Sequence, residues 1–261
     1  MSSSLTLGTM AKLSVNENFF KKWTQEMSYV LGFVVADGCV GVKRIRKKDG
    51  IKNYYFNITT KDRSHLENIK KVMNAQQKIC SKGNGHSDRR DYYFIQIGHQ
   101  EICKDLLRLG IYPRKTYNLN PIKVPDKYFL DFVRGFFDGD GTVYILKVNG
   151  TPQIKADFIS SSLSFIKFFN TQLCKNLDIP EKTIHQELPR REDQKLIRYS
   201  IYFYIDDCEK LAKFMYRNNP TLYLSRKRQV FEKWESIERR HYIKQNYPSK
   251  IGWRLNEKVL A

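Results

Sequence analysis

Two short stretches, one in each half of the chain, share one layout and constrain the fold more than any other feature. Residues 30–38 read VLGFVVADG, and residues 133–141 read VRGFFDGDG. Each is an apolar run of helical character that ends in Asp-Gly, at Asp37 in the first copy and at Asp140 in the second. Two copies at domain-sized spacing indicate an internal repeat.

Small residues recur four positions apart in both stretches, Gly32 with Ala36 and Gly135 with Gly139. Residues at that spacing share one face of a helix, so two such helices can pack with their backbones almost in contact. The two aspartates would then lie side by side where the helices end. Paired carboxylates make a hard-oxygen site for divalent metal ions, and such sites drive phosphodiester hydrolysis.

Both stretches resemble the LAGLIDADG motif of homing endonucleases. The second aspartate of that motif is the family's metal ligand, and it falls on Asp37 and Asp140. The resemblance implies a metal site formed by these aspartates with the following Gly38 and Gly141. It also implies Mg²⁺ as the cofactor, with Mn²⁺ or Ca²⁺ as substitutes and Ca²⁺ without efficient cleavage.

The sequence departs from the motif at its first acidic position, where the first copy has Val35 and the second keeps Asp138. That position is not the family's catalytic one, so activity is still expected. The family commonly carries a lysine in the active site, just beyond the third helix of each half. Arg-Lys pairs stand at both corresponding places, and the resemblance assigns Lys115 and Lys227 to this role in preference to plain surface lysines.

Positive charge is spread along the whole chain. The sequence holds 46 Lys and Arg against 27 Asp and Glu, a formal net charge of +19, and no single tail carries it. Diffuse charge of this size is typical of a surface that binds a polyanion, although a merely soluble basic protein would share the composition. With 41% hydrophobic residues the chain can fill one or two ordinary cores, and its apolar runs are too short to span a bilayer.

Cysteine usage argues against both a disulfide framework and a zinc site. The cysteines are odd in number and none are paired at Cys-Xaa-Xaa-Cys spacing: Cys39, Cys80, Cys103, Cys174 and Cys208. Residues 1–11 lack the charged start and long apolar centre of a secretory signal. We therefore expect a soluble protein of a reducing intracellular compartment.

The segments after the two motifs repeat as well. Each motif is followed by a predicted hairpin, with turn signals at Lys48-Asp49-Gly50 and at Asn149-Gly150. Amphipathic helices come next, and then two more strands and a third helix in each half. The predicted helices cover residues 64–74 and 163–176, and the predicted strands cover residues 78–82, 92–97, 182–188 and 197–204.

The predicted fold class is α+β, with two pseudo-symmetric αββαββα repeats. As the resemblance implies, each repeat carries an antiparallel four-stranded sheet, and the sheets form a DNA-binding saddle. Helices are expected to begin at the N-cap residues Thr24 and Asp126. A last helix over residues 225–246 is interpreted as a packing helix rather than a separate DNA-binding element. The predicted bounds are 1–23 for an N-terminal arm, 24–120 and 121–246 for the repeats, and 247–261 for a C-terminal tail.

The open face of each sheet would offer polar side chains to the major groove. Apolar and polar residues alternate along the strand that ends at Thr60 and along its counterpart in the second half. Amides suit adenine edges, lysine suits guanine, and a carboxylate can accept from the cytosine amino group. The residues expected to face bases are Tyr55, Asn57, Thr59, Gln153, Lys155 and Asp157.

Basic residues in the hairpins and loops are expected to contact the same DNA. Charge occupies both faces of the first strand, so the orientation of Lys43, Arg44, Arg46 and Lys47 stays open. Arginines in loops suit phosphates better than bases. The remaining expected contacts are Arg89, Arg90, Lys182, Arg190, Arg191 and Arg198.

Together with the resemblance, these features predict a monomeric, site-specific DNA endonuclease that acts on double-stranded DNA and supports intron or intein mobility. Neither a protein partner nor a membrane is expected. The main alternative is a catalytically silent relative, an RNA maturase or a DNA-binding protein. Such relatives often lose one or both acids, and this chain keeps both. A calcium loop at residues 138–141 is disfavoured because its later ligands are missing, and a histidine-based nuclease is disfavoured because the histidines lack metal-like spacing.

Overall fold

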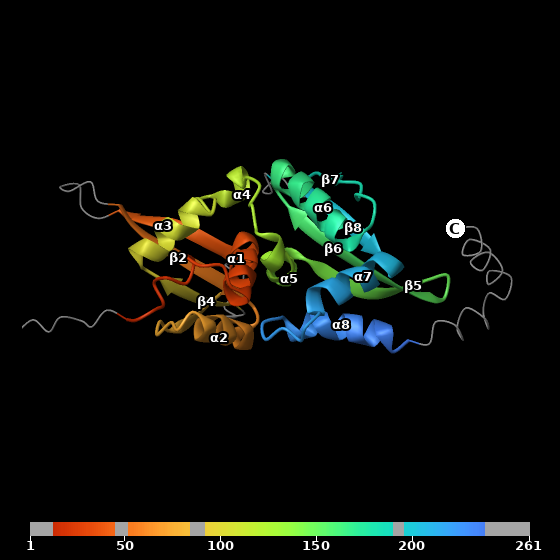
Figure 1. Ribbon diagram of the computed structural model, residues 1–261, viewed down its shortest axis with the longest axis horizontal. Coiled ribbons are helices and arrows are strands. Elements are labelled where there is room, and N and C mark those ends of the chain that lie inside the picture. Colours follow the sequence, from red (N-terminus) through yellow and green to blue (C-terminus); the bar gives the residue numbers. More distant parts are fainter. Residues whose placement is uncertain (1–12, 45–51, 84–91, 190–195, 238–261) are drawn as a thin grey trace, which may run out of the picture.

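The computed structural model describes residues 13–44, 52–83, 92–189 and 196–237. Two halves of like architecture lie side by side along the long axis, with one motif helix from each at the centre (Figure 1). The first half contains α1 (Gln25–Asp37), β1 (Gly38–Arg44), β2 (Lys52–Thr60), α2 (Arg63–Val72), β3 (Ile79–Lys82), β4 (Tyr92–Ile97), α3 (Gln100–Arg108) and the short α4 (Lys115–Asn118).

The second half repeats this order, with the longer α8 in the place of the short α4. Its elements are α5 (Asp126–Asp140), β5 (Thr142–Val148), β6 (Thr151–Ser160), α6 (Leu163–Leu177), β7 (His185–Glu187), β8 (Arg198–Tyr204), α7 (Ile205–Tyr216) and α8 (Ser225–Glu235). The sheets have strand orders β1-β2-β4-β3 and β5-β6-β8-β7, and every pairing is antiparallel. The predicted α+β fold with two αββαββα repeats is confirmed.

Apolar side chains of β2 and β6 point to the covered face of each sheet, as the alternation in the sequence predicts. Phe56 and Ile58 are fully buried against the helices, whereas Asn57 lies between them on the other face, opposite Cys39 of β1. The turn between β5 and β6 has positive φ at both Asn149 and Gly150, at 49° and 80°, which is the backbone of a type I′ hairpin. The turn predicted at residues 48–50 lies outside the described residues.

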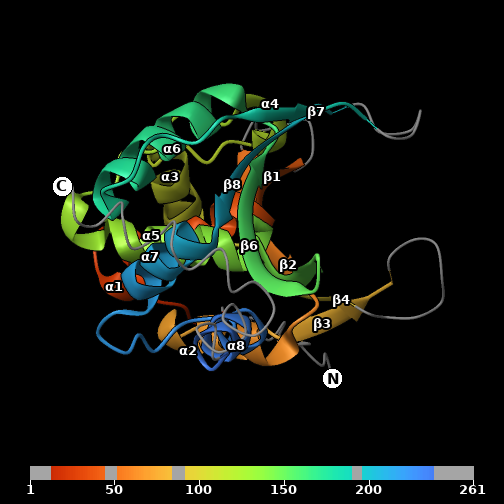
Figure 2. The same cartoon turned by 90° about the vertical axis from the view of Figure 1, so that its right-hand side faces the viewer.

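All the long helices lie on one side of the two sheets. Figure 2 shows the described helices to one side and the strands to the other, and no described helix covers the second face of either sheet. Buried phenylalanines fill the space between helices and sheet in the second half, including Phe136, Phe158 and Phe169, whose rings meet at centroid distances of 4.9–5.7 Å. The covered faces hold the core, so the uncovered faces are available to a partner.

The helix starts agree with the prediction at one motif helix and differ at the other. The Thr24 hydroxyl accepts a hydrogen bond from the Met27 amide at 3.0 Å, so Thr24 is the N-cap of α1. The N-cap of α5 is Pro125, and Asp126 is the first helical residue instead. The prediction for Asp126 was wrong by one position. Pro125 holds the extended backbone of the cap without a side-chain hydrogen bond, and the negative charge of Asp126 in the first turn interacts favourably with the helix dipole.

The segment before α1 packs more closely than the sequence indicated, and the last helix packs as it predicted. Phe19 and Phe20, in the predicted N-terminal arm, are buried, and the Phe20 ring lies 6.2 Å from that of Phe56. The described part of the last helix packs on the second half through Phe231 and Trp234, as predicted for a packing helix. This helix ends at Glu235 with Ser236 as its C-cap, so the predicted helix over residues 225–246 was too long, and residues 238–246 lie outside the described residues. Among the described residues, no helix is long and apolar enough to cross a membrane.

Candidate active site

The two motif helices meet at their small residues. A Cβ added at Gly32 would lie 2.2 Å from the Phe132 carbonyl oxygen, and one at Gly135 would lie 2.0 Å from the Tyr29 carbonyl oxygen. Neither contact is possible for a real side chain, and neither obstacle is a flexible group that could move aside. The backbones of α1 and α5 are therefore in direct contact, as the spacing of small residues predicts.

This contact continues to the carboxyl ends of both helices. A Cβ added at Gly139 would lie 2.2 Å from the Ala36 Cβ and 3.7 Å from the Asp37 amide nitrogen. Both helices end at the motif aspartate, and the first strand of each half begins at once, at Gly38 after α1 and at Thr142, one residue further on, after α5. Asp37 and Asp140 therefore lie together at the junction of the two halves, where the helices pass into the sheets.

The two carboxylates influence each other. The pKa of Asp37 is raised to about 6, mainly because burial removes its contact with water and to a smaller extent because the charge of Asp140 repels it. The side chain of Asp140 keeps more contact with solvent, yet the protein atoms around it still raise its pKa by desolvation. In both cases Lys115 and Lys227 act in the opposite direction and favour the charged form. The site is thus a pair of carboxylates with two ammonium groups nearby.

Each lysine caps the motif helix of its own half. The Lys115 ammonium donates to the carbonyl oxygens of Val35 and, at 2.9 Å, Ala36. The Lys227 ammonium donates to the carbonyl oxygens of Phe137 at 2.6 Å and Asp138 at 2.8 Å, and also to those of Gly139 and Gly141. Carbonyl oxygens in the last turn of a helix have no hydrogen-bond donor within the helix. These lysines supply the donors that the carbonyls would otherwise lack.

Burial gives the two lysines unusual acidity. Their exposed fractions are 8% for Lys115 and 5% for Lys227, and desolvation lowers the pKa of both. The pKa of Lys227 falls to about 8, although the carboxylates of Asp138, Asp37 and Asp140 oppose this. The prediction placed both lysines at the active site. The structure brings both ammonium groups next to Asp37 and Asp140, where they bond backbone oxygens that flank the aspartates, and their catalytic role stays a prediction.

The donor set fits a divalent cation of the hard, oxygen-preferring kind. Within the described residues, neither Asp37 nor Asp140 has a hydrogen-bonded partner for its carboxylate, and their mutual repulsion is of the kind that a bound cation relieves. The described residues contain no cluster of three or more His, Cys, Asp or Glu arranged around a metal position. Backbone oxygens, water and a phosphate ligand would have to complete the coordination. The carbonyl of Gly141 accepts from Lys227, while Gly38 directly follows Asp37 at the start of β1.

The uncovered sheet faces carry most of the residues predicted to face bases. Tyr55, Asn57 and Thr59 are partly exposed on β2, and Gln153 and Lys155 are partly exposed on β6. The Lys155 ammonium lies 3.7 Å from the centre of the Tyr202 ring on the neighbouring strand. Asp157 shares this face by register, but its side chain is only 7% exposed and lies beside Thr142. Its carboxylate is thus less accessible than the alternation indicated.

The remaining predicted DNA contacts fall into three groups. Lys182 bonds Asp207 of α7 at 2.7 Å, on the helical side, and Arg198 lies 3.5 Å from Glu187. Lys43 and Arg44 belong to β1, of which only the backbone is described at these positions. The rest lie outside the described residues: Arg46, Lys47, Arg89, Arg90, Arg190 and Arg191.

A buried polar network at the junction was not foreseen. Asp138 is 1% exposed and accepts hydrogen bonds from the Tyr29 hydroxyl at 2.6 Å and the Leu224 amide at 2.8 Å. Burial raises the pKa of Asp138 to about 6, against these hydrogen bonds. The sequence contained one signal for it, the acidic residue retained in only one copy of the motif. The hydrogen-bond partners of Asp138 lie far from it in the sequence, at Tyr29 and Leu224, so residue spacing could not predict them.

Comparison with known proteins identifies the fold. No protein-family model matches the chain. An uncharacterized protein of Methanocaldococcus jannaschii is 28% identical over 188 residues, which are 72% of this chain and 60% of that protein. The chain therefore matches less than two thirds of the length of this relative.

Solved structures align over most of the chain. The LAGLIDADG homing endonuclease I-GzeII in complex with its DNA target has a TM-score of 0.56 at 11% identity, covering 91% of this chain and 97% of that one. I-SmaMI bound to cleaved DNA has a TM-score of 0.56 at 14% identity, with 92% and 97% covered. I-CpaMI bound to uncleaved DNA has a TM-score of 0.54 at 14% sequence identity, and the alignment covers 89% of this chain and 96% of that one. The chain has the two-repeat fold of LAGLIDADG homing endonucleases.

Proposed function

We propose that this chain is a site-specific, metal-dependent DNA endonuclease of the homing endonuclease type. It would bind a long, partly asymmetric duplex in the major groove and hydrolyse one phosphodiester on each strand. The observation that carries the proposal is the position of Asp37 and Asp140, which the glycine contacts of α1 and α5 bring together between the two open sheet faces. The DNA-bound neighbours of the same fold support it.

The residues of the junction have separate tasks in this proposal. Asp37 and Asp140 would hold divalent ions, with Mg²⁺ as the natural choice. A bound ion of this kind activates water and stabilises the leaving oxygen. Lys115 and Lys227 would place positive charge next to the reacting phosphates and offset the charge that develops there. Their hydrogen bonds to helix-end carbonyls hold the ammonium groups in place before DNA arrives.

The surroundings of the junction suit a nucleic acid. The sequence carries a net charge of +19, and the uncovered sheet faces present amide, hydroxyl and lysine groups at Asn57, Thr59 and Lys155. Amides and lysine are suited to base edges in the major groove, and the distributed charge would be matched by phosphates. The two faces differ in sequence, so the two half-sites of the target would differ as well.

The alternative is a catalytically silent relative that acts as an RNA maturase or a DNA-binding protein. A silent protein has no need to keep two carboxylates together at a cost in solvation. Both aspartates are present here, and desolvation raises the pKa of both, so the arrangement is one that favours a bound cation. This favours the endonuclease over the alternative.

The test is cleavage of a randomised duplex library by the purified full chain with Mg²⁺. Sequencing of the cut ends would show whether one site is enriched and which bond is broken on each strand. The endonuclease proposal expects an enriched site whose cleavage stops in EDTA. Retention of a specific duplex or of structured RNA without any cleavage would support the alternative and overturn the proposal.

A further inference from the structure

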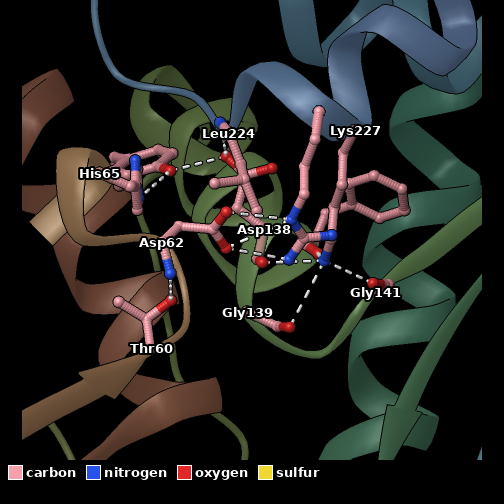
Figure 3. Close-up of polar contacts among 11 residues, drawn as sticks. Thr60, Asp62, His65, Asp138, Gly139, Gly141, Leu224 and Lys227 are labelled. Atoms are coloured by element: carbon pink, nitrogen blue, oxygen red, sulfur yellow. Dashed lines mark hydrogen bonds and ion pairs between the residues drawn. The ribbon is translucent and has the colours of Figure 1, made fainter. Parts of the chain in front are cut away.

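The first turn of α8 is tied to the opposite half by an ion pair. The Arg226 Nε lies 3.2 Å from each carboxylate oxygen of Asp62, and its Nη2 lies 3.1 Å from one of them (Figure 3). Asp62 is the N-cap residue of α2, in the first half, but its side chain makes no capping hydrogen bond. Figures 1 and 2 both show α2 and α8 side by side. The carboxylate of Asp62 therefore serves the contact between halves rather than its own helix.

A second connection runs through the buried network. Leu224, the N-cap residue of α8, donates its amide to Asp138, which also accepts from the hydroxyl of Tyr29 in the first half. Burial and the charge of Asp138 raise the pKa of Tyr29 well above its usual value, which keeps the hydroxyl proton available. Because that proton goes to Asp138, the Nε2 of His65, 3.0 Å away, must donate to the Tyr29 oxygen. Two first-half side chains thus fix the carboxylate that holds the start of α8.

These anchors flank the buried lysine of the second half. Arg226 is held directly by Asp62 of the first half, and Leu224 is held by Asp138, which Tyr29 of the first half bonds in turn. Lys227 is the next residue, with its ammonium on the helix-end carbonyls beside Asp140. A shift of the first turn of α8 would move Lys227 with it. The position of Lys227 therefore depends on contacts with the first half.

The lysine of the first half is held differently. Val35 occupies the place of Asp138, and Ser162 is the N-cap at the position that matches Asp62. The Ser162 hydroxyl donates to the Leu119 carbonyl oxygen, a neutral contact with the segment that leaves α4. Among the described residues, Arg114 has no carboxylate partner comparable with Asp62. Lys115 therefore lacks the ionic and buried polar anchors that flank Lys227.

We propose that Asp62 and Tyr29 are positioning residues for Lys227, so that cleavage of the strand served by Lys227 depends on contacts across the junction while cleavage of the other strand does not. This inference rests on the proposed endonuclease function. Asp62 and Tyr29 touch no reacting group, and they act through Arg226 and Asp138.

The cleavage experiment uses Asp62→Asn on the site recovered from the library, with a different fluorophore on each strand. Asparagine keeps the size of the side chain and is an equally good N-cap, so the start of α2 should persist. We expect one strand to be cut slower by roughly 10- to 100-fold, as for a displaced catalytic group, while the other strand and the DNA dissociation constant are unchanged. Nicked duplex should accumulate, and Asp62→Glu, which keeps the charge, should restore most of the rate.

Glu67→Gln is the matched control, because it breaks an exposed ion pair on the same helix, with Arg63 at 3.4 Å, that does not cross the junction. Its strand rates should equal those of the unmodified protein. Equal slowing of both strands by Asp62→Asn, or no slowing of either, would overturn the positioning role.

A second measurement needs no DNA and separates this inference from the proposed function. Reductive methylation of the free protein, read by peptide mass spectrometry, reports the accessibility of Lys227 relative to Lys115. Asp62→Asn and Tyr29→Phe should each raise the labelling rate of Lys227 alone. An unchanged ratio would overturn the positioning role even if the chain cuts DNA, whereas a changed ratio in a chain that cuts no duplex would support it and reject the endonuclease proposal.

Discussion

The Lys227 ammonium bonds the carbonyl oxygens on both sides of Asp140, at Gly139 and at Gly141. The backbone that carries the Asp140 carboxylate is thereby held by a charged group from α8, a helix far along the chain. Lysine and aspartate do not form a direct ion pair here. The carboxylate is left for another cation, and the ammonium stays beside it to offset negative charge.

The first prediction concerns the aspartates. Asp37→Asn or Asp140→Asn should abolish or severely slow double-strand cleavage, because an amide holds a divalent ion far less well than a carboxylate. DNA binding should survive, since removing an acid from a basic surface does not weaken its attraction for phosphate. Cleavage assays and gel shifts with the library-selected site would measure the two effects. Full activity in the double variant would contradict the metal role.

The lysines should matter for stability as well as for cleavage. Lys227→Ala leaves buried carbonyls at the end of α5 without their donor, so we expect the free energy of unfolding in urea to fall by about 1–3 kcal/mol. Cutting of one strand should slow in the same variant. Lys213→Ala, at an exposed position of α7, is the control and should change the free energy of unfolding by less than about 0.5 kcal/mol. Equal effects of the two substitutions would show that the capping bonds contribute nothing.

Helix contact at the junction gives a steric prediction. The Cβ of Gly135→Ala would lie 2.0 Å from the Tyr29 carbonyl oxygen, so the helices must separate. We expect a loss of about 1–3 kcal/mol in the free energy of unfolding, as for other overpacked cores. A Cβ at Gly98 would meet nothing within 4 Å, which makes Gly98→Ala the matched control. Thermal melting of both variants tests this, and equal melting temperatures would contradict the close approach.

His65 gives a prediction of pH dependence. Desolvation lowers its pKa to about 4, while the unfolded chain titrates near the ordinary value of 6.5. Below pH 6.5 the unfolded state therefore binds more protons, and His65 costs stability until the folded state is protonated near pH 4. The free energy of unfolding of the unmodified protein, minus that of His65→Gln, should fall on acidification by up to about 1.4 kcal/mol per pH unit. Urea unfolding of both proteins at pH 7 and pH 5 measures the change, and a constant difference would argue against a buried neutral His65.

Base preference should respond to Lys155, which stands on the uncovered face over Tyr202. Lys155→Ala should relax selection at one base pair of the target, with about 1–3 kcal/mol of discrimination at stake. Lys182→Ala is the control, because Lys182 is paired with Asp207 on the helical side. Repeating the library selection with each variant gives the measurement. A uniform loss of affinity for every target would instead identify Lys155 as a phosphate contact.

Much of the fold was predictable because its information is local. The motif helices, the Asn149-Gly150 hairpin and the alternation around Phe56 follow from residue types at fixed spacings, and the structure agrees with them. Two predictions failed, one for a local reason and one for a tertiary reason. The residue type of Asp126 predicts an N-cap, but the preceding Pro125 already supplies the extended backbone and is the cap. Asp157 has the right parity for base contact, but parity cannot reveal that neighbouring strands cover its carboxylate.

By itself, the sequence determined which atoms could meet: glycines that let two helices touch, and an aspartate at the end of each. These depend on the period of the helix and on the size of one side chain, which are properties of short segments. Only the tertiary structure decided what surrounds them. The acidity of Lys227, the burial of Asp138 and the bond from Arg226 to Asp62 each require groups separated by many residues to lie within a few ångströms. Desolvation and Coulomb interactions depend on distances in space, and spacing along the chain does not encode them.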